Sequence, residues 1–328
     1  MSQFATSGDG ATPLVVEFDD NRLLPVLFGD FDRHLARIEQ GLDVTLASRG
    51  NSVAIDGDAG SVDLARRVLE SLYNDLRDGR DVGMAEVEAA VRLVRSAAQA
   101  EVAPLENGKL LIRTPKRHIS PRSPGQQRYI RALLDAELVF GLGPAGTGKT
   151  YLAVGMAVSM LTSGRVDRIV LSRPAVEAGE RLGFLPGDMK DKIDPYLRPL
   201  YDALYDMLPP DQVDRRLSTG EIEVAPLAFM RGRTLSNAYV ILDEAQNATP
   251  VQMKMFLTRL GENARMVVTG DLSQIDLPGG VVSGLHHAVR TIEGVPGVRV
   301  VSLHAEDVVR HELVSRIVSA YDAAENDG

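Results

Sequence analysis

Short apolar runs recur through the second part of the chain, separated by longer stretches with helical periodicity. Five of these runs are AELVFGLG, RIVLSRP, AYVILDE, RMVVTGD and VRVVSLH. Most of them do not alternate apolar with polar residues, which is typical of parallel strands that helices cover on both faces. The pattern therefore predicts an α/β fold with a doubly wound, mostly parallel sheet.

The first hundred residues show another pattern, in which three short strands alternate with helices. The strands are expected at LVVEF (14–18) and at DVTLAS and SVAIDG, which the turn RGN joins. Helices are expected over 32–42, 61–79 and 84–98. This order is similar to that of a degenerate KH module, a small α/β fold that binds nucleic acids. KH domains clamp the backbone with a GXXG loop, whereas GDFD (29–32) lacks the second glycine and carries two acids. RNA binding, protein docking and a purely structural role therefore remain open for this part.

A basic, proline-rich stretch separates the two parts. It contains four prolines between residues 104 and 125, a composition typical of a linker. We therefore expect a KH-like domain over 1–100, a linker over 101–125 and a larger α/β domain over 126–328. Residues 109–131 carry seven basic side chains and no acid, although the whole chain has a net charge of −9. A solvated linker and a surface that contacts phosphates both explain this basic belt.

The glycine-rich stretch GLGPAGTGKT (141–150) lies between the strand ELVFGLG and the helix KTYLAVGMAVSML. Its pattern Gly-x4-Gly-Lys-Thr is the P-loop signature, in which the loop backbone cradles phosphates. Lys149 is expected to neutralise the outer phosphates and Thr150 to supply an oxygen for Mg²⁺. A glycine-rich turn that only caps a helix is the alternative. The residues expected to bind nucleotide here are Gly143, Pro144, Ala145, Gly146, Thr147, Gly148, Lys149, Thr150 and Tyr151.

Two acids, Asp243 and Glu244, end the strand AYVIL. Ligands of open α/β sheets bind at the carboxyl ends of the strands. We therefore expect Asp243 to serve Mg²⁺, as in a Walker B motif, and Glu244 to orient and deprotonate an attacking water. Capping of the following helix is the alternative. The later run VVTGDLSQIDLP offers Gln274 for the terminal phosphate or the attacking water, and Asp271 for the same network.

Taken together, these motifs resemble those of the PhoH-like ATPases, whose core is similar to the first RecA-like domain of superfamily 1 helicases. The resemblance covers residues 104–325. It rests on SPGQQRYIRAL, GPAGTGKT, LSRPAVEAGERLGFLPGD, PYLRPLYDAL, FMRGRTL, VILDEAQNAT, TGDLSQIDLP and VVRHELVSRIVSAY. It implies a RecA-like P-loop fold, hydrolysis of ATP with Mg²⁺, a role in RNA metabolism and homo-oligomeric rings such as hexamers. The first part also resembles the KH-like extension of the branch associated with an endoribonuclease of ribosome maturation, which implies an endoribonuclease partner.

The resemblance also implies roles for single side chains. Gln126 resembles the helicase glutamine that reads the adenine edge, with Gln127 as the alternative. Helicases close a second RecA-like domain over ATP, and none is expected here, so a rate-enhancing arginine must come from this domain or a neighbouring subunit. Arg310 is expected to act across a subunit interface, with Arg316 as the alternative. Arg173 resembles a motif that contacts nucleic acid or relays the state of the phosphate, and pairing with an acid is the alternative. The same roles are open for Arg231 and Arg233.

The composition limits where such a protein works. The first thirty residues lack the features of an export signal, and no apolar run approaches the roughly 18 residues of a membrane span. Cysteine is absent, which fits a reducing compartment. We therefore expect a cytoplasmic ATPase without membrane contact, coupled to RNA remodelling or to an RNA-processing partner. An ATP-binding conformational switch with little turnover is the alternative. A stripe of leucines on residues 196–208 is assigned to the core or to a subunit contact.

Overall fold

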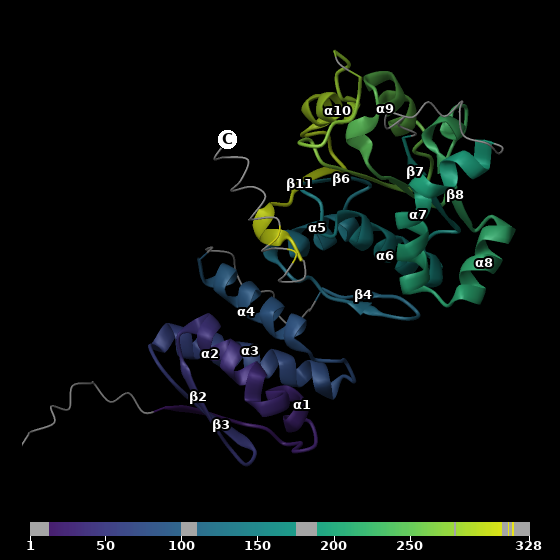
Figure 1. Cartoon of the computed structure of the whole chain (residues 1–328). Helices are drawn as coiled ribbons and strands as arrows, with labels where there is room; N and C mark the ends of the chain where they lie inside the picture. Colours follow the sequence, from purple (N-terminus) through teal and green to yellow (C-terminus); the bar gives the residue numbers. More distant parts are fainter. Residues whose placement is uncertain are drawn as a thin grey trace, which may run out of the picture. The chain divides into compact units, whose positions relative to one another are not determined.

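The computed structural model describes residues 13–99, 110–174, 189–278 and 280–309, together with Val314 and Ile317. The chain forms two compact units (Figure 1). The first unit comprises residues 1–108 with 122–124, and the second comprises residues 109–121 and 125–328. None of the helices in these described ranges has the length and apolar character that a bilayer span requires.

The first unit is an antiparallel sheet of three strands packed against helices. The strands β1 (Leu14–Glu17), β2 (Thr45–Arg49) and β3 (Ser52–Asp56) pair in the order β1-β3-β2. The helices are α1 (Leu24–Phe28), α2 (Arg33–Leu42), α3 (Ala59–Arg77) and α4 (Met84–Gln99). Val53 and Ile55 are fully buried while the residues beside them in β3 are not, so only one face of the sheet joins the core. The three strands and the helices between and after them confirm the small α/β unit that the sequence predicted, and its likeness to a KH module stays a prediction.

The second unit contains a six-stranded sheet in which all neighbouring strands are parallel. The strands are β6 (Leu138–Leu142), β7 (Arg168–Arg173), β8 (Ile222–Pro226), β9 (Ala238–Leu242), β10 (Arg265–Gly270) and β11 (Val298–Ser302). Their order in the sheet is β11-β6-β10-β9-β7-β8. Strand β10 therefore lies between β6 and β9, the two strands that precede the P-loop and the acid pair.

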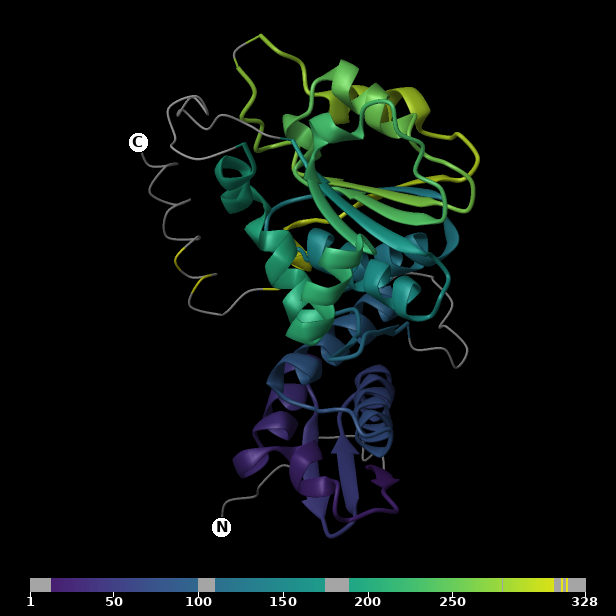
Figure 2. The same cartoon turned by 90° about the vertical axis from the view of Figure 1, so that its right-hand side faces the viewer.

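Helices cover both faces of this sheet (Figure 2). They are α5 (Pro124–Asp135), α6 (Lys149–Thr162), α7 (Met189–Met207), α8 (Pro210–Thr219), α9 (Pro250–Leu257) and α10 (Gly284–Ile292). Tyr239 and Ile241 of β9 join the core under α5 to α8, whereas Val240 joins the core under α9 and α10. The predicted doubly wound α/β fold is confirmed. The leucine stripe, which comprises Leu197, Leu200 and Leu204 of α7 and Leu208 directly after it, is buried in the first of these cores.

Part of the expected linker belongs to the second unit instead. Strands β4 (Ile112–Arg113) and β5 (His118–Ile119) form a two-stranded antiparallel ribbon. Ile112 and Ile119 are buried against the helix that follows the P-loop, while Arg113 and His118 are exposed. The ribbon packs through one apolar face. The sequence predicted a linker here because the prolines and positive charges of this stretch outweigh its few apolar residues.

Candidate nucleotide-binding site

The P-loop connects the end of β6 to the start of α6, as the sequence predicted. Gly143, Gly146 and Gly148 all have positive φ angles, of 145°, 84° and 84°. A Cβ atom at Gly143 would lie 2.3 Å from the carbonyl oxygen of Leu303, so the loop admits only glycine there. Gly148 caps α6 without a side-chain hydrogen bond, so the first backbone amides of the helix are left for an anion.

Lys149 is directed into this loop. Its Nζ atom donates hydrogen bonds to the carbonyl oxygens of Gly143, at 2.6 Å, and Pro144, at 2.9 Å. Burial lowers the pKa of Lys149 below its ordinary value of 10.5, and three nearby carboxylates act in the opposite direction. These carboxylates belong to Asp271, Asp243 and Glu244. The lysine and the acid pair therefore share one electrostatic environment on the same side of the sheet.

The P-loop threonine and the first acid are in direct contact. Thr150 Oγ1 donates a hydrogen bond of 2.6 Å to Asp243 Oδ1. Thr269 Oγ1, from β10, donates to the same oxygen at 2.7 Å, and Asp243 is only 4% exposed. The contact forms because β6, β10 and β9 are neighbours whose carboxyl ends meet at one edge. A hydroxyl and a carboxylate side by side are oxygen ligands of the kind that Mg²⁺ prefers.

The second acid, Glu244, is held by two donors. Its backbone is left-handed, with φ of 52°, a conformation that is uncommon for residues other than glycine. Arg173 Nη2, at the end of β7, lies 3.5 Å from Glu244 Oε1. Gln246 Nε2 donates a hydrogen bond of 2.5 Å to Glu244 Oε2. Among the roles that the sequence left open for Arg173, the structure therefore shows pairing with an acid, and that acid is Glu244 of the expected site.

Asp271 and Gln274 follow β10 but differ in their surroundings. Asp271 is buried, and its Oδ1 atom accepts hydrogen bonds from the amide and hydroxyl groups of Ser273. Its Oδ2 atom is buried without a hydrogen-bond partner among the described residues. Gln274 is exposed, and its backbone N–H donates to the backbone carbonyl oxygen of Asp271. Asp271 therefore belongs to the buried charge cluster around Lys149, while Gln274 lies at its exposed margin.

Gln126 and Tyr151, which are expected to flank the nucleotide, form hydrogen bonds to other parts of the protein. Gln126 is buried, and its Nε2 atom donates to the carbonyl oxygen of Thr147 in the P-loop at 3.0 Å. Gln127 is half-buried. The Tyr151 hydroxyl donates to Asp206 of α7 at 2.7 Å. Gln126 thus braces the loop from outside, and Tyr151 connects α6 to α7.

A carboxylate that the sequence analysis did not single out organises this region. Asp307 is 1% exposed, and its two oxygens accept the backbone amides of Gly125, at 3.0 Å, and His304, at 2.8 Å. Two residues later, Val309 N donates to the carbonyl oxygen of Gly146 in the P-loop at 3.0 Å. The segment after β11 is therefore fastened both to the start of α5 and to the P-loop. Only the local capping pattern of Asp307 toward His304 was visible in the sequence.

The remaining arginine candidates fall into different classes. Arg233 forms two hydrogen bonds of 2.7 Å to the carboxylate of Glu223, so it pairs with an acid. Arg231 is exposed. Arg310 and Arg316 lie outside the described residues.

Much of the basic belt is engaged by the protein itself. Lys116 Nζ donates to a backbone carbonyl of α7 at 2.7 Å, and Arg117 lies 2.6 Å from a carboxylate oxygen of Asp206. Arg122 pairs with Glu86 at 3.1 Å. Exposed arginines of the belt without an ion pair of this kind in the described chain are Arg113, Arg128 and Arg131.

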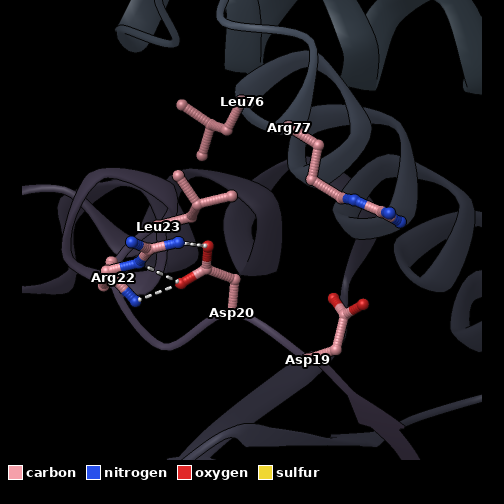
Figure 3. A pocket seen from close by; sticks show the side chains of 6 residues that line it. All are labelled: Asp19, Asp20, Arg22, Leu23, Leu76 and Arg77. Carbon is pink, nitrogen blue, oxygen red and sulfur yellow. Dashed lines mark hydrogen bonds and ion pairs between the residues drawn. The ribbon is translucent and has the colours of Figure 1, made fainter.

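The first unit contains a separate cavity of about 440 Å³ (Figure 3). It is lined by Asp19, Asp20, Arg22, Leu23, Leu76 and Arg77. Hydrogen bonds from Arg22 lower the pKa of Asp20 to about 2, and the Tyr73 hydroxyl donates to Asp19. Acids and arginines are both present in its lining, so the cavity has no single charge that would select a ligand.

Comparisons with known proteins agree with these motifs. The model of the family described as PhoH-like protein matches residues 118–322. The PhoH-like protein of Bacillus subtilis (strain 168) is 49% identical over 296 residues, which cover 90% of this chain and 93% of that protein. The PhoH-like protein of Mycobacterium tuberculosis (strain ATCC 25618 / H37Rv) is 50% identical over 302 residues, covering 92% and 86%.

Among solved structures, the Sulfolobus solfataricus SWI2/SNF2 ATPase core in complex with dsDNA is 14% identical. The matched region covers 51% of this chain and 34% of the Sulfolobus chain, with a TM-score of 0.30. The family match and the P-loop fold support an ATPase-type function. With a family model matched over most of its length and relatives near 50% identity, the chain belongs to the PhoH-like protein family.

Proposed function

We propose that this protein hydrolyses ATP with the help of Mg²⁺ at the sheet edge where β6, β9 and β10 end. One observation carries the proposal: Thr150 of the P-loop contacts Asp243 at 2.6 Å, which brings the two motifs into one site. The charges of Asp243, Glu244 and Asp271 act on Lys149, so the acids face the lysine.

The side chains present fit a nucleotide and a divalent cation. Thr150 and Asp243 would hold Mg²⁺, which would neutralise phosphate charge during hydrolysis. The buried Asp271 Oδ2 atom has no hydrogen-bond partner among the described residues, and a cation would compensate its negative charge. Lys149 donates to loop carbonyls only 2.6 and 2.9 Å away, and phosphate oxygens in the cradle would offer it stronger, charged acceptors.

Glu244 is assigned to water activation. Glu244 directly follows Asp243, the acid assigned to Mg²⁺. Its carboxylate is held by Arg173 at the end of β7 and by Gln246 in the turn after β9. In this role it accepts a proton from the water that attacks the terminal phosphate. Gln274 is assigned to the same water or to the terminal phosphate, because it is exposed on the loop that follows Asp271.

Steady-state phosphate release tests the proposal. Glu244→Gln should reduce release by at least about a hundredfold and leave ATP binding unchanged, because the amide cannot accept the proton. The exposed acid Glu262 offers a matched control, and Glu262→Gln should behave like the wild type. Equal, very slow release by the wild type and Glu244→Gln would support the alternative, an ATP-binding switch with little turnover.

The rate-enhancing arginine is assigned to Arg310, acting on the site of a neighbouring subunit in a ring, with Arg316 as the alternative. The Arg310→Ala variant keeps an intact P-loop but lacks the arginine. The Lys149→Met variant keeps the arginine but lacks the P-loop lysine. Mixing the two inactive variants should therefore restore ATP hydrolysis if the arginine acts between subunits. If the mixture stays as inactive as each variant alone, the arginine does not act in this way.

The hydrolysis cycle is assigned to RNA metabolism in the cytoplasm, either as RNA remodelling or as control of an endoribonuclease partner. The exposed arginines Arg113, Arg128 and Arg131 support this assignment, as does the order of strands and helices in the first unit, from which a KH-like fold is predicted. The GDFD turn at 29–32 points to contacts other than a KH clamp, because its acids would repel a phosphate backbone. ATPase rates measured with and without RNA test the link, since an RNA-coupled enzyme should be stimulated.

A further inference from the structure

We infer that Gln246 is a positioning residue for Glu244, which fixes the Glu244 carboxylate relative to the P-loop. The inference rests on the proposed role of Glu244 in hydrolysis. Gln246 lies in the short 3₁₀ helix η4 (Ala245–Asn247) directly after the acid pair, and it is 1% exposed. A buried amide is retained at low cost only when both of its ends are hydrogen-bonded.

Both ends of the Gln246 amide are used. The Nε2 atom donates to Glu244 Oε2 at 2.5 Å, and the Oε1 atom accepts the backbone N–H of Asp271 at 3.1 Å. These partners also fix the orientation of the amide, because a carboxylate can only accept and an N–H can only donate. An ionised glutamate at this position could accept the Asp271 N–H but could not donate to Glu244. A methionine would form neither of these two hydrogen bonds as the amide does.

The acceptor side of Gln246 is connected to the P-loop. Asp271 follows Gly270, whose carbonyl oxygen accepts the backbone N–H of Gly143 at 3.1 Å. A Cβ atom at Gly270 would lie 2.8 Å from Gln246 Oε1, so the glycine leaves the space that the amide occupies. The Gln246 backbone is anchored too, because Ser283 Oγ donates to its carbonyl oxygen at 2.8 Å. Glu244 is thus tied through one amide to the strand end that holds the phosphate-binding loop.

The hydrogen bond from Gln246 matters because the Glu244 side chain has few other restraints among the described residues. Its side chain is 36% exposed, and Arg173, its ion-pair partner, lies 3.5 Å away. A shift of about 1 Å in a group that orients an attacking water can reduce the rate by roughly a hundredfold. Loss of the Gln246 amide should therefore lower kcat, whereas nucleotide affinity, which depends on Lys149 and the loop backbone, should remain.

The experiment compares Gln246→Glu and Gln246→Met with Asn247→Asp. Gln246→Glu sets two carboxylates against each other, and Gln246→Met removes both hydrogen bonds at similar length. Asn247 is the matched control, because it is also buried in η4 but exchanges its hydrogen bonds with Asp276. We expect kcat to fall between about tenfold and a hundredfold for both Gln246 variants. ATP affinity should stay within twofold, and Asn247→Asp should keep at least a third of the wild-type kcat.

A double variant separates positioning from a merely structural role. In the Glu244→Gln background, Gln246→Met should cause no further loss of the residual single-turnover rate, because its effect passes through the Glu244 carboxylate. A wild-type kcat in the Gln246 variants, an equal loss in Asn247→Asp, or an additive loss in the double variant would each overturn the inference. Hydrolysis that persists unchanged in Glu244→Gln would instead overturn the proposed function itself.

Discussion

Thr150 Oγ1 donates a 2.6 Å hydrogen bond to Asp243 Oδ1, although 93 residues separate them along the chain. Neither residue could reach the other if β6 and β9 lay at opposite edges of the sheet. Only β10 lies between these strands, and its Thr269 donates to the same Asp243 oxygen. The order of the strands therefore brings the P-loop and the acid pair into one site.

Thr150→Val should raise the Mg²⁺ concentration needed for half-maximal ATPase activity by about tenfold or more, since the valine keeps the shape and loses one oxygen ligand. Mg²⁺ titrations of phosphate release measure this shift. Thr162 lies on the same helix, and its hydroxyl donates to Val158 instead. Thr162→Val is thus the control and should leave the Mg²⁺ dependence unchanged. An equal shift in both variants would contradict the assignment.

Lys149→Met should abolish ATP binding and yet stabilise the protein measured without nucleotide. Burial lowers the pKa of Lys149, so the folded state disfavours the charged form that the unfolded chain carries. Between the lowered pKa of the folded state and 10.5 the unfolded chain therefore binds more protons, so wild-type stability rises with pH in this window. The advantage of Lys149→Met in free energy of unfolding should be largest below this window and should narrow as the pH rises through it. Urea unfolding at several pH values checks both statements, and a pH-independent difference would contradict them.

Gln126→Ala should weaken the binding of ATP and of GTP to a similar extent. The Gln126 amide donates to the Thr147 carbonyl at 3.0 Å, so its loss disturbs the loop whichever base is bound. An unsatisfied buried carbonyl costs about 1 to 3 kcal/mol, or roughly five- to 150-fold in affinity. Fluorescent ATP and GTP analogues measure the effect, and Gln127→Ala tests the half-buried alternative for reading the base. A selective loss of ATP affinity would show that Gln126 reads the base.

RNA binding through the basic belt should depend on Arg113, Arg128 and Arg131. These side chains are exposed, whereas Arg117 pairs with Asp206 and Arg122 pairs with Glu86. Replacing the three exposed arginines by alanine should weaken binding of single-stranded RNA and reduce its salt dependence by about two units in the slope of log K against log salt. The triple alanine variant of Lys116, Arg117 and Arg122 should weaken binding less. If the variant of Lys116, Arg117 and Arg122 lost more RNA affinity than the variant of the three exposed arginines, RNA would bind another part of the belt.

The parallel strands could be predicted where their residues are apolar on both faces, as in β9, from Ala238 to Leu242. The edge strand β8 escaped prediction because it is short and carries the acid Glu223 as its second residue. The structure shows why the acid is tolerated there, since Arg233 binds its carboxylate through two hydrogen bonds. An edge strand needs only one neighbour, so its sequence is less restricted than that of a central strand.

The site was predictable where chemistry depends on local spacing, as for Lys149 and Thr150, and where a strand ends in acids. Gln246 and Asp307 were missed because their partners are distant in sequence. Asp271 lies 25 residues from Gln246, and Gly125 lies 182 residues from Asp307. A buried glutamine next to acids has no local pattern that distinguishes it from a helix cap, so tertiary structure was needed to reveal its role.

The close approach of Gly125 to Asp307 constrains how these proteins can diverge. A Cβ atom at position 125 would lie 2.2 Å from Asp307 Oδ2, so an alanine there collides with the carboxylate that binds the backbone amide of the same residue. Substitutions at the two positions should therefore be coupled, because a side chain at position 125 fits only where the carboxylate at position 307 moves away or is replaced.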